Sequence, residues 1–204
     1  MSSEDLTARA RIREAAIDLF AERGIGPATI RDIAERAGVS SGLLRHHFGS
    51  KEGLRDACDE YAMSRMNELR DRLMGPNAQV DPAVLGAMNP SALRLQVYLV
   101  KSMMEGSSNL LFDAAMESGR TWAAHADIET EDLEAWLATM IALKIGLFVM
   151  RDQVGRVLGD DMSTAKGFRR MVRASIEIFS RPIVTPEQAD QALKALDSLY
   201  PIEE

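Results

Sequence analysis

Hydrophobic residues recur at helical spacing along most of this 204-residue chain. The first such pattern ends at Gly24, and its apolar face falls at i, i+3, i+4, i+7 and i+8, in Ile12, Ala15, Ala16, Leu19 and Phe20. No segment alternates apolar and polar residues over the length of a strand, and no internal repeat is present. The pattern therefore predicts an all-α fold.

Capping residues predict two short helices after the first one. Thr29 lies where an N-cap belongs, and Asp32 follows it three residues later, so a helix is expected over about 30–37. Gly38 ends that helix, and Ser40 can cap the next one.

Longer helices follow in the remaining three quarters of the chain. Ser50 can cap a helix that extends to about Leu73, and the Gly, Pro and Asn content of 75–89 predicts a connection. The last helix starts at Thr185 and Pro186, an N-cap followed by proline at the first helical position. Between the connection and that helix, apolar periodicity predicts helices at about 90–105, 110–122, 130–159 and 163–181.

The net charge argues at first against a nucleic-acid partner. The chain carries −7 with a pI near 5.1, and a polyanion binds through Lys and Arg. Acidic residues are spread over the chain, because residues 1–60 have a net charge of −2 and residues 61–204 a net charge of −5. The stretch from Arg36 to Lys51 contains no acidic residue, and Arg36, Arg45 and Lys51 give it a net charge of +3. We therefore expect weak non-specific DNA binding and a small basic patch that carries specificity.

The window from Thr29 to Lys51 has the properties of a helix-turn-helix. Small Ala34 lets two short helices cross closely, and Gly38 tolerates the positive φ of the turn. The second helix begins with small polar residues at 40–42, which can enter a major groove. The alternative is a surface helix that is basic by chance, or a helix-turn-helix without a DNA function.

Residues from about Arg11 to Leu54 resemble the TetR family of transcriptional regulators. The motifs are AxxLFAERG, TIRDIAERAGVS and GLLxHHFxSKEGL. The resemblance implies a helix-turn-helix domain over 1–54 and a helical ligand-binding and dimerisation domain over 55–204. It also implies a repressor that binds palindromic operator DNA as a homodimer and is released by a small-molecule effector.

The resemblance assigns DNA contacts residue by residue. One position departs from the family, which commonly has Tyr where this chain has Arg45; Arg can contact phosphate or read guanine. Base or groove contacts are expected from Ser41, Gly42, Arg45 and His46, and phosphate contacts from Thr29, Ser40, His47 and Lys51.

The long helices at 130–159 and 163–181 are the expected dimer interface. The first is apolar over more than one face, and such a helix needs more than one packing partner. The resemblance implies a four-helix interface made from this pair in each subunit. Periodicity alone leaves a second interpretation open, in which the helix is central to its own monomer.

A cavity for the effector is expected among the middle helices, because ligand sites of bundles lie between helices. Met-rich walls adapt to varied apolar ligands. Ordinary core is the alternative for each apolar residue, and a salt bridge is the alternative for Arg151. The expected lining residues are Met103, Met104, Phe112, Met116, Trp122, Leu147 and Arg151.

The sequence favours no catalytic residue, metal site or cofactor. The only cysteine, Cys58, lies on an apolar helix face, and adjacent His46 and His47 point about 100° apart on a helix. The acidic N-terminus and the absence of a long apolar stretch favour a cytoplasmic protein without a membrane span. Two alternatives stay open: a helical ligand-binding protein or enzyme with a vestigial helix-turn-helix, and a DNA-binding regulator controlled by a protein partner.

We predict that Lys51→Ala weakens binding to all DNA sequences about equally, because Lys51 is assigned to phosphate. The slope of log affinity against log salt should flatten by about one unit. Filter binding or fluorescence anisotropy at several salt concentrations measures both effects. A changed sequence preference with an unchanged salt slope would contradict the assignment.

Overall fold

The computed structural model describes residues 3–74, 90–106, 110–126 and 128–200, and these form helices and short connections without a strand. The all-α prediction is confirmed. The expected connection at 75–89 lies outside the described residues. The helices are α1 (Ser3–Arg23), α2 (Ile30–Ala37), α3 (Ser41–Phe48), α4 (Lys51–Met74), α6 (Pro90–Glu105), α7 (Leu110–Ala123), α8 (Leu133–Val149), α9 (Arg151–Leu158), α10 (Ala165–Phe179) and α11 (Pro186–Leu199).

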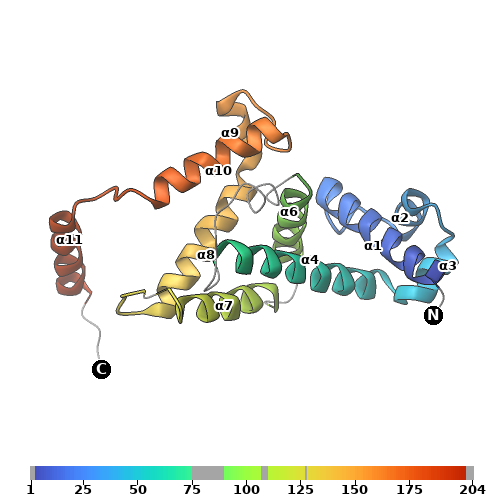
Figure 1. The fold of residues 1–204 in the computed structure, drawn as a ribbon, viewed down its shortest axis with the longest axis horizontal. Helices are drawn as coiled ribbons and strands as arrows, with labels where there is room; N and C mark the ends of the chain where they lie inside the picture. Colours follow the sequence, from blue (N-terminus) through green and yellow to red (C-terminus); the bar gives the residue numbers. More distant parts are fainter. Residues whose placement is uncertain (1–2, 75–89, 107–109, 127, 201–204) are drawn as a thin grey trace.

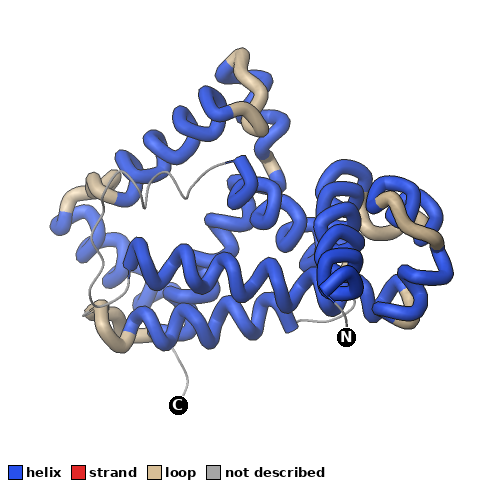
Figure 2. The backbone as a smooth tube through the Cα atoms, turned by 45° about the vertical axis from the view of Figure 1, so that its right-hand side comes forward, coloured by secondary structure: helices blue, strands red, loops and turns tan. Residues whose placement is uncertain are grey.

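The helices are arranged from one end of the molecule to the other (Figure 1). Helices α1, α2 and α3 gather at one end, and α4 runs from them into the body beside α6 and α7. Figure 2 shows the same separation, with the three N-terminal helices grouped at one side. Helix α11 lies at the opposite end.

The main core joins the N-terminal helices to the body. Helix α1 buries its apolar face between α2, α4 and α6, and Phe20 stacks on Tyr98 with ring centroids 6.0 Å apart. Leu54 and Cys58 of α4 are fully buried in the same cluster. Helix α4 also passes without interruption through the expected domain boundary at residue 54, and that boundary stays a prediction.

Buried polar groups join α6 to α4. The Tyr98 hydroxyl donates to the Asp59 carboxylate at 2.5 Å. Arg55 donates from Nε to the Ser102 hydroxyl at 3.0 Å and from Nη2 to the Ser102 carbonyl at 2.7 Å. Burial raises the pKa of Asp59, while the bond from Tyr98 acts in the opposite direction.

A second set of charges joins α6 to α1. The Arg94 guanidinium donates to Asp18 from Nη1 and to Glu14 from Nη2, each at 2.5 Å. The carboxylates lie one helical turn apart on α1, so one arginine on α6 reaches both. Helix α6 therefore contacts both α1 and α4 through specific polar bonds.

The expected single helix over 130–159 is wrong, because it divides into α8 and α9 with a bend of 59° at Met150. Neither proline nor glycine lies at the bend. Val154 and Leu158 of α9 pack against the main core, and we attribute the bend to this contact, which a straight continuation of α8 would lose. Helical periodicity in the sequence does not predict a bend between two consecutive apolar helices.

No single helix in the described part of the chain has the length and apolar character to cross a membrane. Only the bent pair of α8 and α9 reaches that length and composition together.

We predict that Tyr98→Phe lowers the free energy of unfolding by about 1–2 kcal/mol, because Asp59 loses a hydroxyl donor at a buried position. Urea denaturation measures the change. Tyr61→Phe is the control, since the Tyr61 hydroxyl makes no hydrogen bond within the described residues and the contact of its ring with Arg13 survives.

The loss of unfolding free energy in Tyr98→Phe should also depend on pH. Burial raises the pKa of Asp59 because it disfavours the charged carboxylate. Asp59 therefore stabilises the fold at low pH, where it is protonated, and this stabilisation is lost as the pH rises through the raised pKa. The hydroxyl bond offsets this loss by stabilising the carboxylate. Tyr98→Phe should therefore cost more at about pH 7 than at about pH 4. An equal cost at both values would contradict the assignment.

Candidate nucleic-acid interface

A capping box starts α2 as expected. The Thr29 hydroxyl accepts from the Asp32 backbone N–H at 3.1 Å, and the Asp32 carboxylate accepts from the Thr29 backbone N–H at 3.1 Å. The hydrogen bond from Thr29 lowers the pKa of Asp32. Thr29 is exposed, but its hydroxyl and N–H are both engaged by this carboxylate.

Helix α3 is oriented with one face in the core and the other outside. Ser40 caps it by accepting from the Leu43 N–H at 3.1 Å, and Gly38 turns the chain between α2 and α3 at φ 65°. Leu44 is fully buried and fixes the inner face. Gly42, Arg45 and His46 are exposed, so three of the four expected base or groove contacts lie on the accessible face, and Ser41 is half-buried.

Of the other expected phosphate contacts, Ser40 is exposed, whereas His47 and Lys51 are less accessible. His47 is half-buried, and its ring meets Phe48 edge-on with centroids 6.2 Å apart. Lys51 is also half-buried, and its Nζ donates to the Gly26 carbonyl at 2.9 Å. Lys51 thus holds the connection between α1 and α2 from the start of α4.

An ion pair reduces the basic character of the helix-turn-helix. Arg36 donates to both carboxylate oxygens of Glu22 at 3.0 Å. This contact lowers the pKa of Glu22 and raises that of Arg36. Of the three cations that distinguish this window, Arg45 is exposed, Arg36 is exposed but paired with Glu22, and Lys51 is half-buried.

Helix α1 supplies cations that the sequence analysis missed. The Arg9 guanidinium lies 5.3 Å from the centre of the Phe48 ring, which places a cation beside the C-terminal end of α3. Arg11 donates to the Gly38 carbonyl at 3.3 Å, at the turn itself. Arg9 and Arg11 stand in the sequence as possible cations for DNA. Their proximity to α3 depends on how α1 packs, which the sequence pattern does not give.

A carboxylate from the body holds the connection between α1 and α2. One Glu105 oxygen accepts from the Ile25 N–H at 2.7 Å and from the Gly26 N–H at 3.0 Å. Gly24 has φ +92°, and a Cβ there would lie 2.5 Å from a Glu105 oxygen. Helix α6 therefore fixes the backbone just before Thr29.

The expected ligand residues lie in different places, and their role stays a prediction. Met103 and Leu147 pack on the main core, whereas Phe112, Met116 and Trp122 belong to a second cluster with Leu137. Trp122 stacks on Trp136 there, with centroids 6.1 Å apart. Met104 is 68% exposed.

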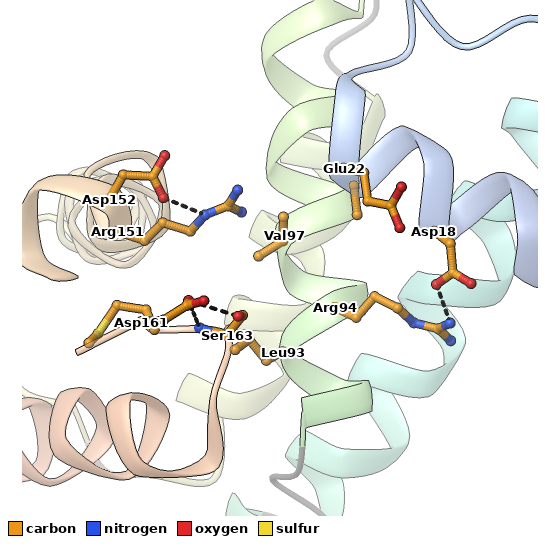
Figure 3. A pocket seen from close by; sticks show the side chains of 11 residues that line it. Asp18, Glu22, Leu93, Arg94, Val97, Arg151, Asp152, Asp161 and Ser163 are labelled. Carbon is orange, nitrogen blue, oxygen red and sulfur yellow. Dashed lines mark hydrogen bonds and ion pairs between the residues drawn. The ribbon is translucent and has the colours of Figure 1, made fainter.

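A cavity of about 310 Å³ lies between α1, α6 and the connection from α9 to α10 (Figure 3). Arg151 is the one expected ligand residue that lines it. The wall is strongly charged, with Arg94 bonded to Asp18, and Arg151 bonded to Asp152 at 3.3 Å. The cavity adjoins the same contact of α1 with α6 that positions the N-terminal helices.

The described residues contain no group of His, Cys, Asp and Glu side chains that could hold a metal ion. Cys58 is fully buried, and burial raises the pKa of its thiol far above the ordinary value. This thiol is therefore protonated at neutral pH.

Comparisons with known proteins agree with the fold and the motifs. The family description "Bacterial regulatory proteins, tetR family" matches residues 12–58. The HTH-type transcriptional regulatory protein RaaS of Mycobacterium tuberculosis is 46% identical over 106 residues, which cover 52% of this chain and 50% of RaaS. The HTH-type transcriptional repressor KstR2 of Rhodococcus jostii is 52% identical over 48 residues, covering 24% of each chain. The chain thus spans about half or less of the length of these relatives.

Solved structures extend the likeness beyond the motifs. A TetR-family transcriptional regulator from Rhodococcus sp. has 25% identity and a TM-score of 0.52, covering 70% of this chain and 86% of that one. A transcriptional regulator from Aquifex aeolicus has 18% identity and a TM-score of 0.52, covering 70% and 85%, and shows the fold alone. The chain has the fold of a helix-turn-helix regulator. Its N-terminal part, residues 12–58, is similar to the TetR family, and the relatives named above are transcriptional regulators.

We predict that Glu105→Ala lowers the free energy of unfolding by about 1–3 kcal/mol, because the Ile25 and Gly26 N–H groups lose their charged acceptor. Chemical denaturation measures the effect. Glu68→Ala is the control, since it removes only an exposed ion pair with Arg65 and should cost at most about 0.5 kcal/mol. Equal effects of the two variants would show that the carboxylate does not hold this connection.

Proposed function

We propose that this protein is a cytoplasmic transcriptional repressor that binds palindromic operator DNA as a homodimer. The observation that carries the proposal is the orientation of α3. Leu44 anchors the helix in the core, while Gly42, Arg45 and His46 lie on the accessible face of a helix-turn-helix. Small residues at the start of the helix and a cation at its end fit a major groove about 12 Å wide. The repressor name of KstR2 supports the sign of regulation.

The proposed homodimer is supported by the small size of α3, the helix proposed to enter the major groove. Helix α3 has eight residues and reaches only a few base pairs, so two copies are needed to specify an operator. Exposed apolar side chains on the C-terminal helices support an interface there. Leu143 of α8 is 63% exposed and Phe179 of α10 is 62% exposed.

Release by a small-molecule effector is proposed to act through α6. This helix contacts α1 through Arg94, α4 through Ser102 and the connection before α2 through Glu105. A ligand that favours one position of α6 would change the spacing of the two α3 helices, which is a shift between two dimer populations. The charged cavity beside Arg94 and the second cluster, which contains Met116, are the two candidate places for the effector.

Selection of bound sequences from random double-stranded DNA tests the proposal. We expect a palindromic consensus whose half-sites lie on one face of the duplex, because the two α3 helices of a dimer enter successive major grooves. Recovery of random sequences at moderate salt would contradict specific operator binding.

We further predict that Arg45→Ala weakens binding to the selected operator by about 10-fold or more, which corresponds to 1–3 kcal/mol for a good contact. Arg36→Ala is the matched control, because Glu22 already engages that guanidinium and its loss should change affinity less. Repeating the selection with Arg45→Ala separates the two roles of this residue. A relaxed consensus indicates base contact, and an unchanged consensus with a flatter salt slope indicates phosphate contact. Equal losses for both variants would contradict the orientation of α3.

A further inference from the structure

The C-terminal helix α11 lies apart from the rest of the described chain (Figure 1). Every residue from 176 to 200 is exposed except Ala189, which is half-buried. The helix itself is well defined, because Thr185 and Gln188 form a capping box and Pro186 occupies the first turn. Its sequence thus specifies a helix, but its own chain covers almost none of it.

One face of α11 is suited to packing. The apolar stripe of α11 falls at i, i+4, i+7 and i+11, in Ala189, Leu193, Leu196 and Tyr200. Leu193 is 60% exposed, Leu196 52% and Tyr200 71%. A 14-residue helix is marginal in water on its own, so the stripe requires a surface to cover it.

The preceding helix offers apolar surface on two sides. Ile176 and Ile178 of α10 are each 56% exposed. They point about 200° apart around the helix axis and so lie on opposite sides. A single α11 folded back on its own α10 would cover only one of these sides.

The charges of the two helices are complementary. Helix α10 carries +3, from Lys166, Arg169, Arg170, Arg173 and Glu177. Helix α11 carries −2, from Glu187, Asp190, Lys194 and Asp197. Two copies of α11 repel each other, whereas α11 and α10 attract.

The connection between the helices directs α11 away from its own chain. Pro182 cannot continue α10, and α11 is set away from α10 in Figure 1. Ile183 in this connection is 85% exposed and Val184 54%, so the connection also presents apolar side chains outward.

We propose that α11 is an exchanged arm, whose apolar stripe packs on the α8–α10 surface of a second copy of this chain while the second copy does the same in return. The inference rests on the proposed homodimer and adds to it α11 as a segment that binds the second copy. The apolar part of the receiving surface includes Leu143, Ile176 and Phe179, all more than half exposed.

Photocrosslinking from the arm tests the exchange directly. The full chain carries Leu196→p-benzoylphenylalanine, and isotope-labelled and unlabelled copies are mixed, allowed to exchange and irradiated. We expect a covalent dimer in which the labelled arm is joined to an unlabelled α8 or α10 peptide, identified by mass spectrometry. Cross-links only within one chain, only between two arms, or absent from a dimeric sample would each overturn the proposal.

A pair of double variants measures the contribution of the stripe. Leu193→Asp with Leu196→Asp should raise the dimer dissociation constant about 100-fold, the equivalent of about 3 kcal/mol. Gln191→Asp with Ser198→Asp adds the same charge on the opposite face of α11 and should change it by less than about threefold. Sedimentation equilibrium of the full chains gives both constants.

The outcomes separate the arm from the proposed function. A tight wild-type dimer that selects a palindrome but is insensitive to the stripe variants overturns the arm and leaves the operator-binding homodimer intact. A wild-type chain that stays monomeric at micromolar concentration removes the homodimer, and with it the arm.

Discussion

The burial of α6 against α1 and α4 is the interaction on which the arrangement of this protein depends. Tyr98 is fully buried where the three helices meet, and its hydroxyl bonds to Asp59 of α4. On the same helix, Arg94 bonds to α1 and Glu105 bonds to the backbone before α2. These bonds connect α6 directly to α1, to α4 and to the backbone before α2, so the position of α6 helps to fix the position of the N-terminal helices.

The charge on the surface of the helix-turn-helix depends on which of its cations are neutralised by ion pairs. A basic stretch within an acidic chain loses part of its charge to the pair of Arg36 with Glu22. Arg45 stays exposed on α3, and Arg9 of α1 lies beside Phe48 at the end of that helix. The surface that faces DNA in our proposal is therefore built by two helices, and its small size fits weak attraction to arbitrary sequence.

Apolar surface is distributed unevenly along the chain. The N-terminal helices bury theirs against the body, whereas α10 and α11 leave much of theirs outside. A soluble chain seldom exposes so many large apolar side chains without a partner. The proposed homodimer and the exchanged arm give this surface an occupant, and they place association at the end opposite to the reading head.

The sequence by itself determined the helices, their caps and the reading motif, because these depend on neighbours within about four residues. Thr29 with Asp32, Ser40 with Leu43 and the positive φ of Gly38 are all local. Only the tertiary structure decided the bend at Met150, the bonds from Glu105 to residues 25 and 26, and the engagement of Arg36 by Glu22. Each of these depends on the direction in which separate helices pack, and a periodic pattern gives the face of a helix but not the neighbour that meets it.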